Sequence, residues 1–367
     1  MPEFFSFIAG SGLSYADSWI EKLRAGNLNA FVALLLSKLP NLATFRVGYA
    51  VVLADPEGYG YGEIPPQMTD ENQFLGKLFQ SAAFDTSNHG ISRFQNLQDV
   101  FFPGPPDNDP GRNPEFSNPR DVMAFLSFPS MRSLSGWCTN PNSFPFAWPA
   151  GPPDLSRLTS LFLSFVNVEF LAQILERTMN LKKLHWGWKP NIDRLNSDTI
   201  DLGRFVKALK PCQDTLEDLT IECTNSLTFH DTVTREFEVR GSLSGLDSFA
   251  NIKRFQAPFI LLLPDWNWEV NESRRLEDSM PPNVEIVTIT NENWIPNYGY
   301  DAKSEIAKLR AWITETAATR TPKLVEICFY ESEDSDWRYP EDHENFEQIF
   351  EGSQLRHKIM KEVDKKP

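Results

Sequence analysis

Cysteine is scarce in this sequence, and long hydrophobic runs are missing. The four cysteines among 367 residues stand far apart and form no Cys-x-x-Cys pair. They therefore predict neither a zinc site nor a disulfide framework, and they favour a reducing compartment. No run approaches the roughly 18 apolar residues that cross a bilayer. No positively charged segment follows Met1, so we expect an intracellular protein, cytoplasmic or nuclear, that is not inserted into a membrane.

Positive charge is also in short supply. Lysine and arginine number 35 against 50 aspartates and glutamates, which gives a formal net charge of -15. Nucleic acids and anionic membranes select an excess of basic residues, so this acidic composition argues against both as partners. It favours a neutral or basic protein surface as the partner. We expect the protein to be a monomer.

Signatures of catalysis are missing as well. The sequence has no G-x-S-x-G elbow and no phosphate-binding loop, and the glycines from Gly58 to Gly62 lack the spacing of a dinucleotide site. His343 and Glu344 resemble half of a zinc-protease helix, but Glu347 replaces the second histidine. The five histidines fall in separate segments. We therefore predict no catalytic residue, no metal site and no cofactor.

What the sequence does contain is a recurring phrase: an apolar residue, two variable residues, an apolar residue, one variable residue and a third apolar residue. This is the strand phrase of a leucine-rich repeat. Its copies are spaced more widely and less evenly than the roughly 20 to 29 residues of regular repeats. The copies are Leu42–Val47, Leu97–Phe102, Met131–Leu134, Leu158–Leu163, Leu181–Trp186, Leu216–Ile221, Ile252–Ala257, Val284–Ile289 and Leu324–Phe329.

Between the copies lie apolar residues at helical spacing, as in residues 31–39, 74–79 and 170–175, and proline-rich insertions. Alternating strands and helices require a parallel sheet. We predict an α/β fold, an irregular leucine-rich-repeat solenoid with a curved parallel sheet on the concave side and helices and loops on the convex side. Residues 1–27 would form a flank, 28–330 about nine repeats, and 331–367 an acidic flank with a capping helix. The capping helix would carry Phe346, Ile349, Phe350, Leu355, Ile359 and Val363.

Side chains alternate across a strand, so the variable residues of each phrase should point to the concave face. We expect a protein partner to bind there. For Phe101 and Phe162 an alternative stays open, in which a nearby loop covers the rings. The candidate partner-binding residues are Arg46, Phe101, Phe162, Lys183, His185, Asp218, Glu222, Arg254, Gln256 and Tyr330.

A family resemblance adds to this interpretation. Trp19, Leu23, Gly26 and Ala30, together with the phrases at 158–163, 214–221 and 241–249, resemble the repeat region of large fungal F-box proteins. The resemblance covers about residues 19 to 330. It implies the substrate-recognition region of a cullin-RING ubiquitin-ligase receptor, in which an F-box docks the ligase adaptor. No F-box segment precedes Trp19 in this sequence. Either the chain is a truncated form, or it is a repeat protein without the ligase half, and contact with the adaptor would then be indirect.

Three functions follow as hypotheses. The first is an interaction module whose concave face recruits a protein such as a ubiquitination target. The second is an F-box-less scaffold or inhibitor that uses the same face and has no link to ubiquitination. The third is a hydrolase carried by the inserted loops.

Overall fold

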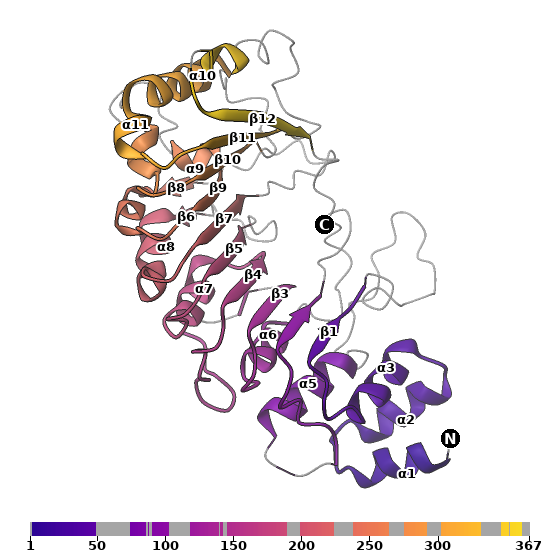
Figure 1. The fold of residues 1–367 in the computed structure, drawn as a ribbon. Coiled ribbons are helices and arrows are strands. Elements are labelled where there is room, and N and C mark those ends of the chain that lie inside the picture. Colours follow the sequence, from indigo (N-terminus) through magenta and orange to yellow (C-terminus); the bar gives the residue numbers. More distant parts are fainter. Residues whose placement is uncertain are drawn as a thin grey trace. The chain divides into compact units, whose positions relative to one another are not determined.

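The computed structural model (Figure 1) has a mixed α/β fold in two compact units, Met1–Val166 and Asn167–Pro367. Among the described residues, the main sheet has ten parallel strands, four in the first unit and six in the second. The α/β class with a parallel sheet is thus confirmed. The boundary at Val166 falls inside the range 28–330 that we expected to be one array. The structure describes residues 2–48, 74–85, 87, 90–102, 118–138, 140–141, 145–188, 199–223, 238–263, 275–291, 302–331, 346–351 and 353–361.

The first unit contains four strands in the order β1-β2-β3-β4, all parallel. Inward residues align across them: Phe45 pairs with Val100, Val100 with Leu134, and Leu134 with Leu161. The strands are β1 (Thr44–Arg46), β2 (Asp99–Phe101), β3 (Ser133–Trp137) and β4 (Ser160–Ser164). The helices are α1 (Pro2–Gly10), α2 (Ala16–Arg24), α3 (Leu28–Ser37), α5 (Phe74–Phe84) and α6 (Pro119–Leu126).

Aromatic rings fill the space between the strands and helices of the first unit. The ring centroid of Phe79 on α5 lies 5.0 Å from Phe45 of β1, 4.8 Å from Phe94 and 4.7 Å from Phe125 of α6. All four side chains are buried. Because Phe45 points inward from its strand, these contacts place α5 and α6 on the inward face of the sheet.

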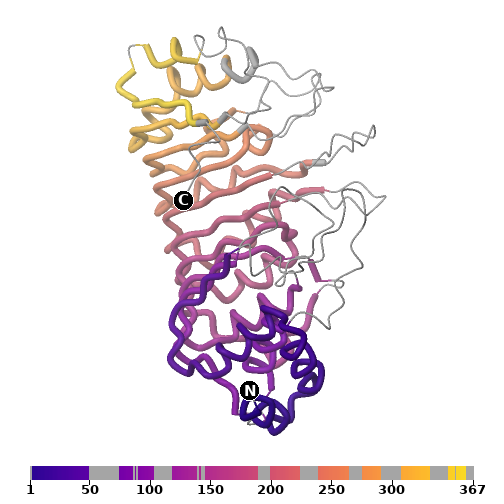
Figure 2. Tube along the Cα trace, turned by 90° about the vertical axis from the view of Figure 1, so that its right-hand side faces the viewer, coloured from indigo at the N-terminus to yellow at the C-terminus, as the bar shows by residue number. Residues whose placement is uncertain are grey.

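The second unit contains six parallel strands in the order β5-β7-β9-β10-β11-β12, and β6 and β8 form a separate parallel pair. Figure 1 shows α8 and α11 on one side of these strands, and in Figure 2 the strands follow one another in chain order. The strands are β5 (Lys183–Trp188), β6 (Thr199–Asp201), β7 (Asp218–Cys223), β8 (Glu238–Arg240), β9 (Arg254–Pro258), β10 (Ile286–Asn291), β11 (Glu326–Glu331) and β12 (Arg356–Lys361). The helices are α7 (Val168–Leu175), α8 (Leu202–Leu209), η3 (Lys210–Cys212), η4 (Ser244–Ser248), α9 (Phe259–Leu262), η5 (Leu276–Ser279), α10 (Ala302–Ala311), η6 (Trp312–Thr316) and α11 (Ala317–Arg320).

Asparagines that precede strands link the chain segments before neighbouring strands. The side-chain amide of Asn251 donates to the carbonyl of Asp214 (2.7 Å), and that of Asn283 donates to the carbonyl of Ala250 (2.9 Å). These bonds satisfy backbone carbonyls just before the preceding strand and so help to fix the alignment of neighbouring strands.

The C-terminal segment differs from the predicted capping helix. Phe346, Ile349 and Phe350 are buried around one helical turn, and Phe346 packs 5.4 Å from Phe329. Ile359 instead belongs to strand β12, where it pairs with Phe329 of β11. The helix prediction was therefore wrong there, because β11 offers backbone hydrogen bonds to the incoming chain. Val363 lies outside the described residues.

Long inserted segments begin where strands end. Between β5 and β6 there are 10 residues and between β7 and β8 there are 14, and proline-rich insertions follow β1 and β2. Parallel strands place their carboxyl ends at one edge of the sheet. Within each unit, the insertions therefore leave the sheet from the same edge.

Candidate binding face of the sheet

The sheet face opposite the helices carries the candidate residues. In β3 and β4 buried and half-buried residues alternate, and the half-buried ones point away from the core. In β5 Leu184 and Trp186 are buried, and Trp186 stacks on Phe205 of α8 at 4.4 Å. All ten sequence-predicted site residues occupy the opposite, outward positions of their strands.

In the first unit the outward face combines aromatic rings with serines. Arg46, Phe101, Ser135 and Phe162 align in one row across β1 to β4. Arg46 is exposed, Phe101 is 43% exposed, and Phe162 is half-buried. Two rings thus flank a small hydroxyl side chain, about two strand spacings or roughly 10 Å apart. Such rings can anchor an apolar side chain of a partner.

Trp137 extends this aromatic face and was missed from the sequence. It is the last residue of β3, and its ring packs edge-to-face on Phe165 at 5.3 Å. The prediction stopped at Leu134 because Gly136 occupies the next inward position. Only glycine fits there, since a Cβ would lie 2.1 Å from Cζ of Phe102. A glycine followed by tryptophan was the available signal.

In the second unit the outward face is charged, and the charges pair across strands. On this face Arg254 Nε lies 2.9 Å from Asp218 Oδ2, and directly before the strands Lys182 and Lys253 lie 3.4 and 3.8 Å from the carboxylate of Glu217. The starts of β5 and β9 are thus basic, and the start of β7 between them is acidic. Asp218 and Arg254, both predicted to contact a partner, bind each other. Opposite charges on neighbouring strands favour this register.

Opposite charges also pair between the last two strands. Arg356 and Lys358 of β12 each lie 3.1 Å from the carboxylate of Glu326 on β11. The hydrogen bond from Lys358 lowers the pKa of the Glu326 carboxyl, and the same bond raises the pKa of Lys358. Both groups therefore stay charged around neutral pH.

His185 has a carboxylate neighbour that its sequence position did not suggest. Its Nε2 lies 2.8 Å from Oε2 of Glu222 on β7, and about one fifth of each side chain is exposed. The sequence predicted His185 only as a contact with a partner. Its acidic neighbour comes from the adjacent strand, which pairs with β5 in parallel.

Tyr330 does not fit the prediction of an exposed anchor. It is only 4% exposed, and Cys328 and Thr290 beside it are also buried. Burial raises the pKa of the Cys328 thiol to about 11. The outward end of β11 is therefore covered, and the Tyr330 ring is not an accessible contact. Lys183 is exposed and Gln256 half-buried, as an accessible face requires.

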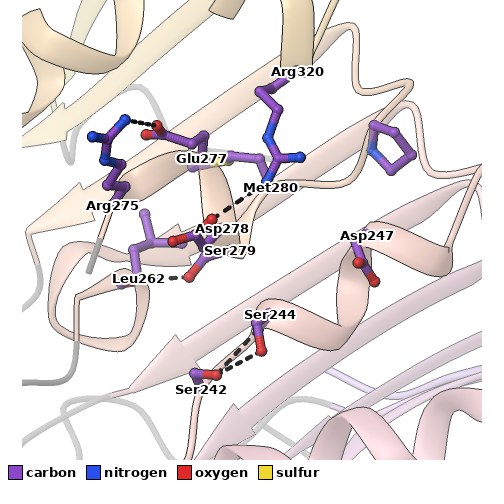
Figure 3. Close-up of a pocket in the computed structure, with 11 residues that line it drawn as sticks. Ser242, Ser244, Asp247, Leu262, Arg275, Glu277, Asp278, Ser279, Met280 and Arg320 are labelled. Carbon is purple, nitrogen blue, oxygen red and sulfur yellow. Dashed lines mark hydrogen bonds and ion pairs between the residues drawn. The ribbon is translucent and has the colours of Figure 1, made fainter. Parts of the chain in front are cut away.

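A polar pocket of about 530 Å³ lies elsewhere in the second unit, between η4, η5 and Arg320 (Figure 3). Arg320 lies 3.4 Å from Asp278, and Arg275 lies 3.6 Å from Glu277. Both guanidinium groups are therefore already paired with carboxylates, whereas small-molecule sites are mostly apolar with few convergent polar groups. The pocket makes a weaker candidate than the sheet face.

Among the described residues, no group of three or more His, Cys, Asp or Glu side chains could hold a metal ion. No helix in the described part of the chain is long and apolar enough to span a membrane.

No protein-family model matches this chain, and no curated protein matches its sequence significantly.

Proposed function

We propose that this chain is an irregular leucine-rich-repeat solenoid that binds another protein on the outward, concave face of its strands. The main support for the proposal is that the strand residues fall into two sets, one buried against the helices and one exposed on the opposite face. Inward residues meet the helices, whereas outward residues such as Phe101, Lys183 and Arg254 are exposed on positions that repeat from strand to strand. A repeated row of exposed, varied side chains is typical of a recognition surface.

The size of the face fits a protein partner. Neighbouring strands lie about 4.8 Å apart, so the six strands of the second unit span roughly 24 Å. A standard interface needs about 800 Å² from each partner. Two or three outward side chains per strand supply a surface of this order, whereas a small ligand would need a deeper pocket.

The resemblance to fungal F-box proteins supports a more specific form of the proposal. The face would select a target for a cullin-RING ubiquitin ligase, inside the cell and from a monomer. A scaffold or inhibitor without a link to ubiquitination would use the same face. The third hypothesis, a hydrolase carried by the inserted loops, falls largely on residues 49–73 and 103–117, which lie outside the described residues.

Affinity purification with mass spectrometry from the source cell tests the proposal. The wild type is compared with a variant in which Arg46, Phe162, His185 and Arg254 are alanine. A matched control replaces the exposed Arg157, Arg177, Lys207 and Lys323, which lie outside the outward face. We expect at least one partner to be lost only in the first variant.

The co-purifying proteins separate the two forms of the proposal. Ligase adaptor and cullin in the wild-type sample support the receptor form, whereas a face-dependent partner without them supports the scaffold form. Equal recovery of every partner by both variants would refute binding on this face. Thermal melting of each variant shows that it is folded.

A further inference from the structure

Helix α3 exposes an apolar surface that its packing in the first unit does not use. One side of the helix is buried against its neighbours, including Ala30, Ala33 and Leu34. The indole N–H of Trp19 on α2 donates to the Ala30 carbonyl at 2.9 Å and fixes this side. The other side is expected to be polar in a surface helix.

The exposed side of α3 is instead apolar. Leu28 is 48% exposed, Leu35 62% and Leu39, just after the helix, 37%. Phe31 and Val32 lie between them and are half-buried. These five residues recur at spacings of three and four, which places them along one side of the helix. We call this row the α3 stripe.

Two cations flank α3 in the chain, one shortly before the helix and one directly after it. Arg24, the last residue of α2, lies 5.1 Å from the centroid of the Phe5 ring, and Lys38, the residue after α3, lies 2.9 Å from that of Phe7. Both side chains are exposed. Within the described part of the chain, neither pairs with a carboxylate. The aromatic contacts therefore hold two uncompensated positive charges beside an apolar row.

We propose that the α3 stripe docks an amphipathic helix of another protein, whose apolar face carries carboxylates at both ends. A partner helix can lay residues at the same spacing of three and four along the stripe. Its carboxylates would meet Arg24 and Lys38, in contrast to the outward strand face, where charges already pair within the chain. The α3 stripe is separate from the outward strand face, and this proposal does not depend on the function proposed for the strand face.

The charges also argue against a second copy of this chain as the occupant. An antiparallel pair of α3 helices related by a two-fold axis would bring Arg24 of one copy beside Lys38 of the other. Like charges at both ends would oppose that pairing. A membrane surface is opposed by the net charge of -15.

Fluorescence anisotropy with the purified full chain tests the proposal. One labelled probe is a synthetic amphipathic helix of about 18 residues with leucines at spacings of three and four and glutamates at both ends. A second probe keeps the leucines and replaces the glutamates by lysines. We expect the acidic probe to bind the wild type at least about tenfold more tightly than the basic probe, because its glutamates would meet Arg24 and Lys38. A tenfold difference in affinity is a modest difference in binding free energy.

Three variants sharpen the result. Replacing both Leu28 and Leu35 by Gln should weaken binding of the acidic probe at least about tenfold. Lys38→Glu should reduce the preference for the acidic probe. Met179→Gln is the matched control, because Met179 is 65% exposed but lies in the second unit, and it should leave binding unchanged. Melting temperatures of the variants should match the wild type because all four side chains are exposed.

Other results would overturn the proposal. Equal binding of both probes, or equal binding by all variants, would show that the α3 stripe does not recognise an acidic helix. Sedimentation as a dimer that Leu35→Gln converts to a monomer would identify a second copy as the occupant. Binding to phosphatidylserine vesicles without binding to the acidic probe would identify a lipid surface.

Discussion

The outward strand faces of the two units follow the same geometry but carry different chemistry. The first unit presents Phe101, Phe162 and Trp137 around serines, whereas the second presents Asp218 and Arg254 in a cross-strand ion pair. In both, the inward residues are buried and apolar. The inward residues of the strands therefore keep the same apolar character in both units, while the outward residues differ and set the chemistry of each face.

The largest loss of stability should come from charging a buried inward leucine, a position that both units contain. Leu219→Asp in the second unit and Leu161→Asp in the first each bury an unpaired carboxylate where the leucine is at most 1% exposed. We expect each to lower the free energy of unfolding by more than about 4 kcal/mol. Thermal denaturation followed by circular dichroism measures this. The neighbouring changes Thr220→Ala and Ser160→Ala should stay within about 0.5 kcal/mol, and equal effects at all four sites would contradict the register.

A smaller loss of stability should appear at a position special to the first unit. Gly136→Ala places a Cβ against the ring of Phe102, which is 2% exposed and has little room to move. We expect a loss of about 1–3 kcal/mol from overpacking. The midpoint of urea unfolding tests it, with Ser135→Ala on the outward side of the same strand as the control. An unchanged midpoint would show that the Phe102 ring relaxes freely.

The two faces should differ in how a bound partner responds to salt. Once a partner is identified, Phe101→Ala should weaken its binding by about 1–2 kcal/mol with little dependence on salt, if the first unit contacts it. Lys183→Ala should weaken binding less, and its effect should shrink between about 0.1 and 1 M salt as charges are screened. Isothermal titration calorimetry at both salt concentrations makes the measurement. A salt-dependent effect of Phe101→Ala together with a salt-independent effect of Lys183→Ala would contradict the assignment of an apolar face to the first unit and a charged face to the second.

The smallest effect concerns acid sensitivity in the second unit. Lys358 lowers the pKa of the Glu326 carboxyl, so this group stabilises the fold above its unfolded pKa, and the contribution is lost as the pH falls through the folded value. Glu326→Gln should therefore lose less stability than the wild type between neutral pH and about pH 3. Urea unfolding across that range tests it, with Glu285→Gln as the control. An identical pH dependence of wild type and Glu326→Gln would contradict it.

The sequence predicted the parts of the fold that depend on local pattern. The phrase from Leu216 to Ile221 contains most of β7, and the helical spacing at 170–175 lies within α7. These predictions succeeded because burial of one side of each element imposes a period. Strand β12 was missed because its pairing with β11 is decided by a neighbour distant in sequence, not by its own residues.

The candidate site shows the same limit. The repeated phrase predicted which residues lie at outward positions, but it did not predict which side chains contact them or how exposed they are. His185 finds Glu222, and Asp218 finds Arg254, only because the register aligns separate strands. Tyr330 is buried although it lies at an outward position, and alternation along its strand does not predict this burial. Trp137 escaped notice because glycine replaced the expected apolar residue before it.

The common edge from which the insertions leave each unit has a consequence for how such a chain can change. A segment that begins after a strand has ended can lengthen, shorten or be exchanged without moving any residue of the ladder out of register. Variation in length is thereby separated from variation in surface chemistry, since the first occurs at the sheet edge and the second on its face. A protein engineer could graft a foreign loop after Cys223, between β7 and β8, and expect the paired strands β5, β7 and β9 to keep their alignment.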